Sequence, residues 1–397
     1  MLPLHLAAYT LTSALGAGLA PTLDALRHQR SGVQAMRWET LDLDTCLGAV
    51  AGLDSYALRA DLGAFDCRNN RLAQLGLEQD GFAAAVRTAI TRHGQDRVGV
   101  FLGTSTSGIL SAELAYRQRD PGTGHFTGSL DYRHTHNSYS VADFVRSYFG
   151  LEGPAFVVST ACSSSAKVFG NAQRMMACGL IDAAIVGGVD SLCLTTLYGF
   201  NSLQLVSRRP CRPFDAERDG ISIGEAAAFV LLERADSPPA GAIVVSGIGE
   251  SSDAHHMSSP HPQGLGARQA MQAALDMAGL LPAQIGYINL HGTATPSNDA
   301  SEDKAVSGLF GTATPCSSTK GHTGHTLGAA GGIEAIVCAL ALQNGLAPGG
   351  CGTEQLDPDL KSRYLLANIE LPLQHALSNS FGFGGSNCSL VLSKVAA

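Results

Sequence analysis

Short runs of β-branched and aromatic residues alternate with segments of helical apolar spacing along nearly the whole chain, and this alternation constrains the fold more than any other feature. The pattern predicts helices layered on sheets, that is, an α/β protein. The predicted strands are Val98–Leu102, Phe156–Ser159, Ala183–Val186, Ala227–Leu232, Ile243–Ile248, Tyr287–Leu290, His375–Asn379 and Cys388–Leu392. The predicted helices are Leu23–Gln29, Gly81–Arg92, Ser140–Phe149, Ala166–Cys178, Ala267–Ala278, Ser301–Phe310 and Ala330–Gln343.

The chain is long enough for two units, because its 397 residues are 45% hydrophobic and only 15% charged. The segment RADSPPAGAIVV, residues 234–245, has paired prolines and is followed by a new strand pattern. On each side of it, strands are followed by helices and a candidate functional corner follows a strand. We therefore predict two pseudo-duplicated halves, residues 1–239 and 240–397.

Charge and cysteine usage narrow the class of protein. A net charge of −8 argues against a general nucleic-acid footprint, so no nucleic-acid partner is expected. The ten cysteines form neither CxxC pairs nor a disulfide spacing, which is typical of a reducing compartment and predicts a cytoplasmic protein. The apolar N-terminus lacks a basic region and is interpreted as a first strand. No apolar run has the length of a bilayer, so no membrane partner is expected.

The stretch FVVSTACSSSAKVF, residues 156–169, places Cys162 between a predicted strand and a predicted helix. Backbone N–H groups and the helix dipole favour a thiolate at such a position. Cys162 is therefore a candidate nucleophile with a lowered pKa. The alternative is a small buried hydrophobic residue, which is what most cysteines of a reduced protein are.

Three further stretches carry reactive side chains. YINLHGTATPSND places His291 after a strand, and CSSTKGHTGHTLGAAGG carries Lys320, His322 and His325 before a helix. NSFGFGGSN forms a glycine loop, residues 382–385, between two strands. A cysteine, histidines, a lysine and a loop that donates N–H groups to an oxyanion are together the components of acyl transfer through a thioester.

Each of these signals has a weaker alternative when taken alone. His322 and His325 have HxxH spacing, and His255, His256 and His261 form a second cluster. Neither set has a carboxylate or cysteine at the spacing of a zinc site, so no metal is predicted. The glycine loop does not open a helix, which makes phosphate binding a weak alternative.

As a set, TACSSS, HGTATPSND, STKGHTGHTLGAAGG and NSFGFGGSN resemble the motifs of the elongating β-ketoacyl-acyl carrier protein synthases. RPFDAERDGISIGEAAAFVLLE, residues 212–233, and SSDAHHMSSP, residues 251–260, resemble the same family. The similarity covers essentially the whole chain in the family's order. It implies a thiolase-like α/β fold, in which two related halves form five αβαβα layers.

The resemblance also implies an activity and partners. The family joins an acyl-enzyme thioester to malonyl-acyl carrier protein by decarboxylative Claisen condensation, in fatty acid or polyketide biosynthesis. The implied partners are an acyl carrier protein, whose phosphopantetheine carries the substrates, and a second subunit. That subunit is a copy of the chain or a non-catalytic chain-length-factor homologue. No separate cofactor is implied.

Roles of single residues follow from the same resemblance. The nucleophile falls on Cys162, and the catalytic histidines fall on His291 and His325. Lys320 and Glu334 are implied to hold His325 and its surroundings in place.

The remaining implied roles belong to the pocket. Phe383 is the implied gate and oxyanion N–H donor, within a mobile loop that includes Gly382 and Gly384. Residues 253–264 form a second implied gate. Thr293 and Thr295 match residues along the pantetheine arm.

The chain departs from the family's usual pattern at GTSTSGI, residues 103–109, where relatives carry a more apolar loop that lines the acyl pocket. Thr106 either makes this pocket shorter or more polar, or its hydroxyl faces a backbone group. Three serines after Cys162 are also more polar than in many relatives. The resulting hypothesis is a short, unsaturated or aryl-bearing acyl chain, as in aryl polyene pathways.

Carrier proteins are acidic, so exposed arginines are candidates for docking them. The candidates are Arg68, Arg71, Arg208 and Arg209. Ordinary solvated arginines are the alternative.

Four rival classes fit less well. A papain-like protease would carry its cysteine near the mature N-terminus beside an aromatic residue. A thiolase would need a second cysteine in a glycine-rich motif, whereas Cys388 lies in a predicted strand. The initiating ketosynthases have asparagine where His325 stands, and chain-length factors usually lack the cysteine.

Overall fold

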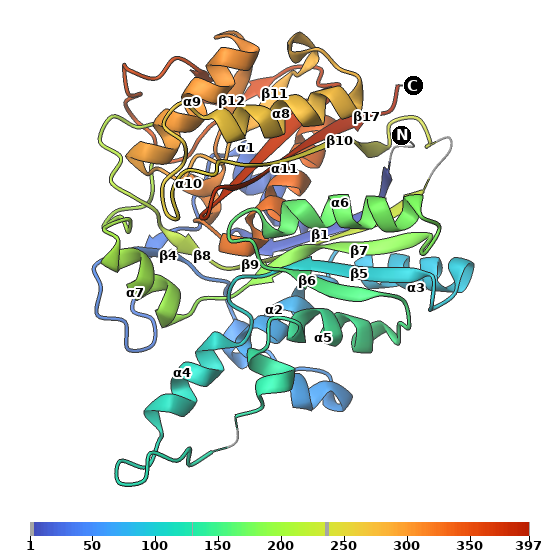
Figure 1. Ribbon diagram of the computed structural model, residues 1–397, viewed down its shortest axis with the longest axis vertical. Coiled ribbons are helices and arrows are strands. Elements are labelled where there is room, and N and C mark those ends of the chain that lie inside the picture. The colour runs from blue at the N-terminus through green and yellow to red at the C-terminus, as the bar shows by residue number, and fades with distance from the viewer. Residues whose placement is uncertain (1–3, 129, 235–237, 397) are drawn as a thin grey trace.

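The computed structural model describes residues 4–128, 130–234 and 238–396 and contains a mixed sheet of 12 strands (Figure 1). The strand order is β14-β12-β11-β16-β17-β10-β1-β9-β7-β5-β6, with β2 paired to β1. The N-terminal and C-terminal parts of the sheet meet where β1 (Leu4–Ser13) pairs antiparallel with β10 (Ile243–Ser252).

The N-terminal part of the sheet is apolar on both faces, because helices cover both. Its strands besides β1 are β9 (Ala226–Arg234), β7 (Ala183–Asp190), β5 (Val98–Gly103) and β6 (Ala155–Val158). The outer face contacts α2 (Arg68–Leu77), α3 (Phe82–His93) and α5 (Ser140–Phe149).

The C-terminal part repeats this plan. Its strands besides β10 are β17 (Ser386–Lys394), β16 (His375–Gly382), β11 (Tyr287–Asn289), β12 (Pro315–Ser317) and β14 (Arg363–Tyr364). Its outer face contacts α8 (Leu265–Ala278), beside which lies α9 (Pro296–Phe310).

Two helices fill the space between the two parts of the sheet, α6 (Ser164–Ala177) and α11 (Ala330–Asn344) (Figure 1). Residues 330–342 of α11 are all buried, as expected for a helix that is apolar all round. The segment Leu327–Asn344 has the length and hydropathy of a membrane span, but 89% of it is buried inside the protein, so it is a core helix. The five αβαβα layers predicted from the family resemblance are confirmed.

Every predicted strand and helix is present, with shifted ends. β7 continues four residues beyond its predicted end at Val186, through Gly187 and Gly188 to Asp190. A Cβ at Gly187 would lie 2.0 Å from the carbonyl oxygen of Ala228, so glycine permits the close approach of β7 and β9.

Several elements were not predicted, because they are short or carry buried polar residues. In α2, for example, Asn69 and Asn70 are buried, which obscures its apolar stripe. The unpredicted α-helices are α2, α4 (Ile109–Arg117), α7 (Leu194–Ser202) and α10 (Lys320–Thr323). The unpredicted short strands are β2 (Gly16–Ala17), β3 (Gln34–Ala35), β4 (Cys46–Gly48), β8 (Ile223–Gly224), β13 (Leu346–Ala347) and β15 (Ile369–Glu370). The predicted helix Leu23–Gln29 corresponds to α1 (Leu19–Arg27).

The predicted boundary segment, residues 234–245, includes residues 235–237, which lie outside the described residues. β9 ends at Arg234 and β10 begins at Ile243. The division at residue 239 stays a prediction.

Candidate active site

Cys162 lies in a tight corner between β6, which ends at Val158, and α6, which begins at Ser164. Ala161 adopts a positive φ of 53°, and the Ser164 hydroxyl accepts a hydrogen bond of 2.9 Å from the Thr160 N–H. These contacts restrain the backbone on both sides of Cys162, whose side chain lines the pocket. Cys162 is 5% exposed, at the bottom of a pocket.

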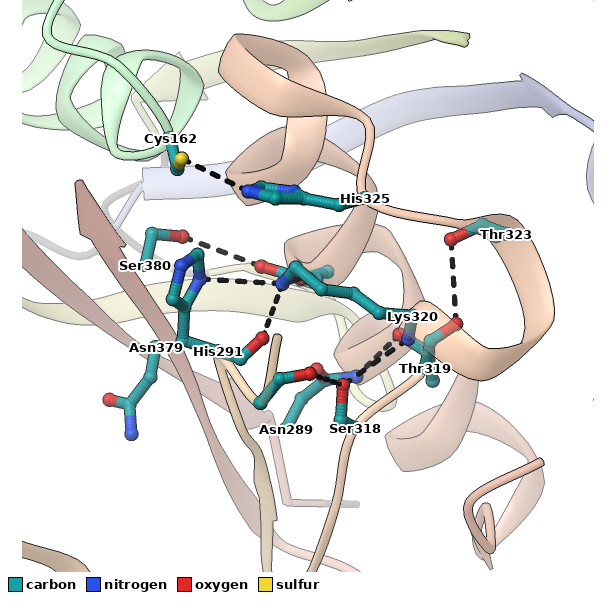
Figure 2. A network of polar contacts seen from close by, with 12 residues as sticks. Cys162, Asn289, His291, Ser318, Thr319, Lys320, Thr323, His325, Asn379 and Ser380 are labelled. Carbon is teal, nitrogen blue, oxygen red and sulfur yellow. Dashed lines mark hydrogen bonds and ion pairs between the residues drawn. The ribbon is translucent and has the colours of Figure 1, made fainter. Parts of the chain in front are cut away.

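Two histidines converge on this sulfur. The Nε2 atom of His325 lies 3.0 Å from Cys162 Sγ, as Figure 2 shows. His291 follows β11, and its ring centroid lies 5.4 Å from that of His325, with the rings nearly perpendicular. The sulfur and the ring nitrogens lie within 4.8 Å of one another. The structure thus brings together the nucleophile and both histidines named in the sequence analysis.

Lys320 fixes the protonation of His291. Its Nζ lies 3.3 Å from His291 Nδ1 and 2.5 Å from the His291 carbonyl oxygen, and it forms an ion pair with Glu334 of α11. A lysine ammonium can only donate, so Nδ1 accepts and the neutral ring carries its proton on Nε2. The ring extends toward Cys162 (Figure 2). The prediction that Lys320 and Glu334 hold His325 itself is therefore wrong, since the Lys320 side chain contacts His291, while their predicted role in the surrounding network stays a prediction.

Burial sets the protonation states of the site. It lowers the pKa of His291 and of His325 well below the usual value, and the Lys320 charge lowers both further. Burial raises the pKa of Cys162 to about 11, against the opposing influence of Lys320 and the Phe383 N–H. The prediction of a lowered cysteine pKa is wrong, because burial is the largest influence on the pKa of this thiol.

These pKa values give a testable pH dependence. Alkylation of Cys162 by iodoacetamide requires the thiolate, and at pH below about 11 the thiol dominates in the resting enzyme. We expect the alkylation rate to rise about tenfold per pH unit between pH 7 and pH 9, as for any thiol well below its pKa. Mass spectrometry of the Cys162 peptide measures the rate, with the exposed Cys178 as internal control. A rate that is already constant at pH 7 would contradict the raised pKa.

The pocket above the sulfur closes on two aromatic rings. Phe383, in the turn between β16 and β17, lies with its ring centroid 5.5 Å from that of Phe200 in α7. A Cβ at Gly382 would lie 2.7 Å from the Thr160 carbonyl oxygen, so glycine lets β16 approach the Cys162 corner.

The two predicted gates are joined to one another. The Gly384 N–H donates to the Met257 carbonyl oxygen at 2.8 Å, and the Asp253 N–H donates to the Gly385 carbonyl oxygen at 2.9 Å. Asn387 donates to the Asp253 carboxylate at 2.9 Å. Movement of Phe383 therefore requires movement of the segment that begins at Asp253.

Thr293 and Thr295 line the pocket on the side of His291. Their hydroxyl groups lie 2.9 Å apart and share a hydrogen bond. Both residues are in place for the predicted contact with the pantetheine arm, which remains a proposal.

The Thr106 hydroxyl is not free to line a pocket. It donates to Asp190 at 2.7 Å and accepts from the Ser191 N–H at 3.1 Å. The alternative in which this hydroxyl faces a backbone group is therefore the one that the geometry supports.

The docking candidates divide into two groups. Arg68 is only 8% exposed and is held by Glu225 and Asp54, so its predicted contact with a carrier protein is wrong. Arg71 is held by Asp66 at 2.5 Å. Arg208 and Arg209 are exposed, in the segment that follows the pocket residue Leu205.

Glu302 is a site residue that the sequence analysis missed. From α9 its carboxylate accepts hydrogen bonds from the N–H groups of His291 at 2.8 Å and Gly292 at 2.7 Å, and Asn379 donates to it at 3.1 Å. Burial raises the pKa of Glu302 to about 7. In the predicted helix Ser301–Phe310 it stands in the first turn, where an acidic residue is common, so no distinct sequence signal marked it.

The metal and thiolase alternatives find little support. His322 is held between the carbonyl oxygens of Arg30 and Gly349, which makes it structural. Cys388 is buried in the core within β17. Among the described residues, one set of His, Cys, Asp or Glu side chains has three clustered ligand atoms, and it is the catalytic set itself. The Lys320 ammonium beside that set opposes a further cation.

Comparisons with known proteins agree with this geometry. Residues 8–237 match the family described as "Beta-ketoacyl synthase, N-terminal domain", and residues 242–354 match "Beta-ketoacyl synthase, C-terminal domain". A 3-oxoacyl-[acyl-carrier-protein] synthase 2 of Staphylococcus aureus is 35% identical over 78% of this chain and 78% of its own length. A mitochondrial 3-oxoacyl-[acyl-carrier-protein] synthase of Arabidopsis thaliana is 38% identical over 62% of this chain and 58% of its own length.

Solved structures are similar over the whole chain. The ketosynthase ApeO of Xenorhabdus doucetiae, in complex with its chain length factor ApeC, is 39% identical with a TM-score of 0.90 and covers 99% of this chain and 98% of its own. A β-ketoacyl synthase from Burkholderia phymatum STM815 is 26% identical with a TM-score of 0.88, over 100% of both chains. With both domains matched, the cysteine and two histidines in one pocket and the lysine against one of these histidines, the chain belongs to the β-ketoacyl synthase family.

Proposed function

We propose that this chain is a β-ketoacyl-acyl carrier protein synthase, an acyltransferase whose nucleophile is Cys162. The observation that carries the proposal is the convergence of Cys162 Sγ, His325 Nε2 and the His291 ring in one buried pocket. A thiol protease needs one histidine beside its cysteine. The additional histidine here, His291, is held in one tautomer by Lys320 and supplies a fixed hydrogen-bond donor for an enolate oxygen.

The first half-reaction loads the enzyme. Cys162 attacks the carbonyl carbon of an acyl-pantetheine thioester, and the thiol proton is transferred to the departing pantetheine sulfur, with His325 Nε2 beside the reacting sulfur. One carbon–sulfur bond forms as another breaks. The N–H groups of Phe383 and Cys162 stabilise the oxyanion, which explains why the gate residue also belongs to the catalytic machinery.

The second half-reaction makes the carbon–carbon bond. Malonyl carrier protein loses its carboxylate as carbon dioxide, and the electron pair left on the α-carbon is stabilised by hydrogen bonds from His291 and His325 to the thioester oxygen. Both rings stay neutral donors because burial lowers their pKa values. The carbanion attacks the acyl-Cys162 carbonyl, the carbon–sulfur bond breaks, and the Cys162 thiolate is released and takes up a proton.

The acyl chain is proposed to be short, unsaturated or aryl-bearing, as in aryl polyene biosynthesis. The support is the overall similarity to the ketosynthase solved with its chain length factor. A panel of saturated, polyene and aryl-polyene acyl carrier proteins tests this by the rate of adduct formation on Cys162. Faster reaction with polyene carriers supports the proposal, and a strong preference for long saturated chains would refute it.

Carrier-protein docking is proposed at Arg208 and Arg209, which are exposed and follow the pocket residue Leu205 in the chain. Charge reversal of both, Arg208→Glu with Arg209→Glu, places acidic residues against an acidic partner. We expect KM for the carrier protein to rise about tenfold, with the iodoacetamide reactivity of Cys162 unchanged. The double variant Arg27→Glu with Arg87→Glu changes the charge equally on exposed positions of α1 and α3 and serves as the control. Equal KM values for the carrier protein in the two double variants would contradict docking at Arg208 and Arg209.

A second subunit of the same fold is proposed to pair along β6. This strand ends the sheet, and its four apolar residues AFVV are all partly exposed. An uncovered edge strand has unpaired backbone N–H and C=O groups that can pair with a strand of another subunit. The similarity to a ketosynthase solved with its chain length factor supports such a partner, as a homologue or as a second copy.

A charge on this edge tests the pairing. We expect Val157→Lys to shift the protein, alone or mixed with its chain-length-factor homologue, from dimer to monomer in light scattering. Thr88→Lys on the exposed face of α3 is the control and leaves the dimer intact. A wild-type protein that is monomeric under both conditions would contradict the pairing.

The cytoplasm is the proposed compartment. All ten cysteines are unpaired thiols, and nine of them are buried or partly buried, as expected in a reducing environment.

A further inference from the structure

Asp190, the last residue of β7, is fully buried and takes no part in the proposed reaction. Its Oδ1 accepts hydrogen bonds from the Thr104 hydroxyl at 2.7 Å, the Ser105 N–H at 2.8 Å, and both the N–H at 2.8 Å and the hydroxyl at 2.7 Å of Thr106. Within the described part of the chain, no ion pair includes Asp190. A buried carboxylate is stable only when hydrogen-bond donors surround it, and here residues 104–106 supply these donors to the Asp190 carboxylate.

All the donors belong to the loop that follows β5, residues 104–107. The same hydroxyls also accept hydrogen bonds, Thr106 from the Ser191 N–H and Thr104 from the Ser107 N–H, each at 3.1 Å. Ser107 has a positive φ of 44°. Because a non-glycine residue holds such a conformation only under external restraint, the loop depends on its attachment to Asp190.

This loop contacts both segments that carry the catalytic pair. The Thr104 N–H donates to the carbonyl oxygen of Val158 at 3.2 Å, at the end of the strand that leads to Cys162. Directly before the loop, a Cβ at Gly103 of β5 would lie 2.3 Å from the backbone nitrogen of Ser165 in α6. On the other side, a Cβ at Gly328 would lie 2.8 Å from Asp190 Oδ2 and 2.9 Å from the Ser105 nitrogen. Gly328 belongs to the 3-10 turn Leu327–Ala329, directly after His325.

We propose that Asp190 is a positioning residue, which holds residues 104–107 between the Cys162 and His325 segments and so maintains the 3.0 Å contact of Sγ with Nε2. The inference rests on the proposed function, because it concerns the acyl transfer at that site. A displacement of about 1 Å between reacting groups can reduce a rate by about a hundredfold. Burial is the largest cause of the raised pKa of Cys162, and the Asp190 charge adds to it.

Three substitutions separate the hydrogen bonds from the charge. Asp190→Ala leaves the buried donors unsatisfied, and we expect acylation of Cys162 to slow by about tenfold or more. Asp190→Asn recovers most of this loss, because its carbonyl oxygen can replace Oδ1. Thr106→Val keeps the shape but removes one donor, with an expected loss of about threefold. Asp182→Asn, just before the other end of β7, is the control and acylates at the wild-type rate.

The pH profile of Cys162 alkylation is the second readout, and a purely structural residue would not move it. Asp190→Asn removes a negative charge near the sulfur, which favours the thiolate. We expect its alkylation profile to shift to lower pH than that of the wild type. Asp182→Asn leaves the profile in place.

The outcomes distinguish this inference from the proposed function. A wild-type protein that takes no acyl group from any carrier refutes the function, while the alkylation profile still tests Asp190. If the wild type is acylated, a folded Asp190→Ala variant with the same rate overturns the inference. Should that variant not fold, an unchanged rate in Thr106→Val together with an unchanged profile in Asp190→Asn overturns it.

Discussion

Cys162→Ala is expected to abolish acyl loading and to lower condensation by at least about a thousandfold, because Cys162 is the one thiol among the residues that line the pocket. The site loses its only sulfur, and the neutral histidines form no stable acyl intermediate here. Intact-protein mass after incubation with acyl carrier protein measures loading, and product analysis after adding malonyl carrier protein measures condensation. The fold is expected to survive, because the substitution removes a single atom beside the pocket.

Cys388→Ala is the matched control for this experiment. Cys388 is equally buried, but it lies in the core within β17 and does not line the pocket. We expect it to lose some stability and to keep acyl loading. An adduct of unchanged yield in Cys162→Ala would assign the nucleophile to another residue.

Lys320→Met is expected to destabilise the protein by about 3–5 kcal/mol, because it leaves the carboxylate of Glu334 buried without its partner. Burial raises the pKa of Glu334, to about 7 with Lys320 present, and removing the ammonium raises it further. A group with a raised pKa in the folded state loses its contribution as pH increases. The deficit in unfolding free energy should therefore be larger at pH 8 than at pH 6, which denaturant titrations at the two values measure.

The double variant Lys320→Met with Glu334→Gln separates stability from catalysis. It removes the uncompensated charge, so much of the lost stability should return. Condensation should not return, because His291 still lacks the donor that fixes its tautomer. Acyl loading should suffer less, since it depends on His325. A double variant that regains condensation along with stability would show that Lys320 acts only in folding.

The strands, the helices and the α/β class were predictable because period and apolar content are local properties of the chain, whereas the five-layer arrangement was implied by the family resemblance. The eight predicted strands and seven predicted helices all exist, and α11 stands out by being apolar on every side. The ends were less predictable. The extension of β7 through Gly187 depends on how closely β9 approaches, which only the assembled sheet decides.

The catalytic residues were found because they stand in specific local motifs, whereas their partners come from distant segments. Motif order places Cys162, His291 and His325, but it does not show which histidine Lys320 contacts. Likewise Arg68 has the appearance of a surface arginine until its contact with Glu225, 157 residues further along the chain, is known. The raised pKa of Cys162 depends on the same long-range packing, because burial is its largest cause.

The most direct test of the reaction follows the mass of the wild-type protein through one catalytic cycle. The protein is incubated with acyl carrier protein and then with malonyl carrier protein, and peptides are mapped after each step. The proposed mechanism predicts an acyl adduct on Cys162 that disappears when malonyl carrier protein is added, as the β-ketoacyl carrier protein appears. An adduct on another residue, or one that persists while product accumulates, would contradict it.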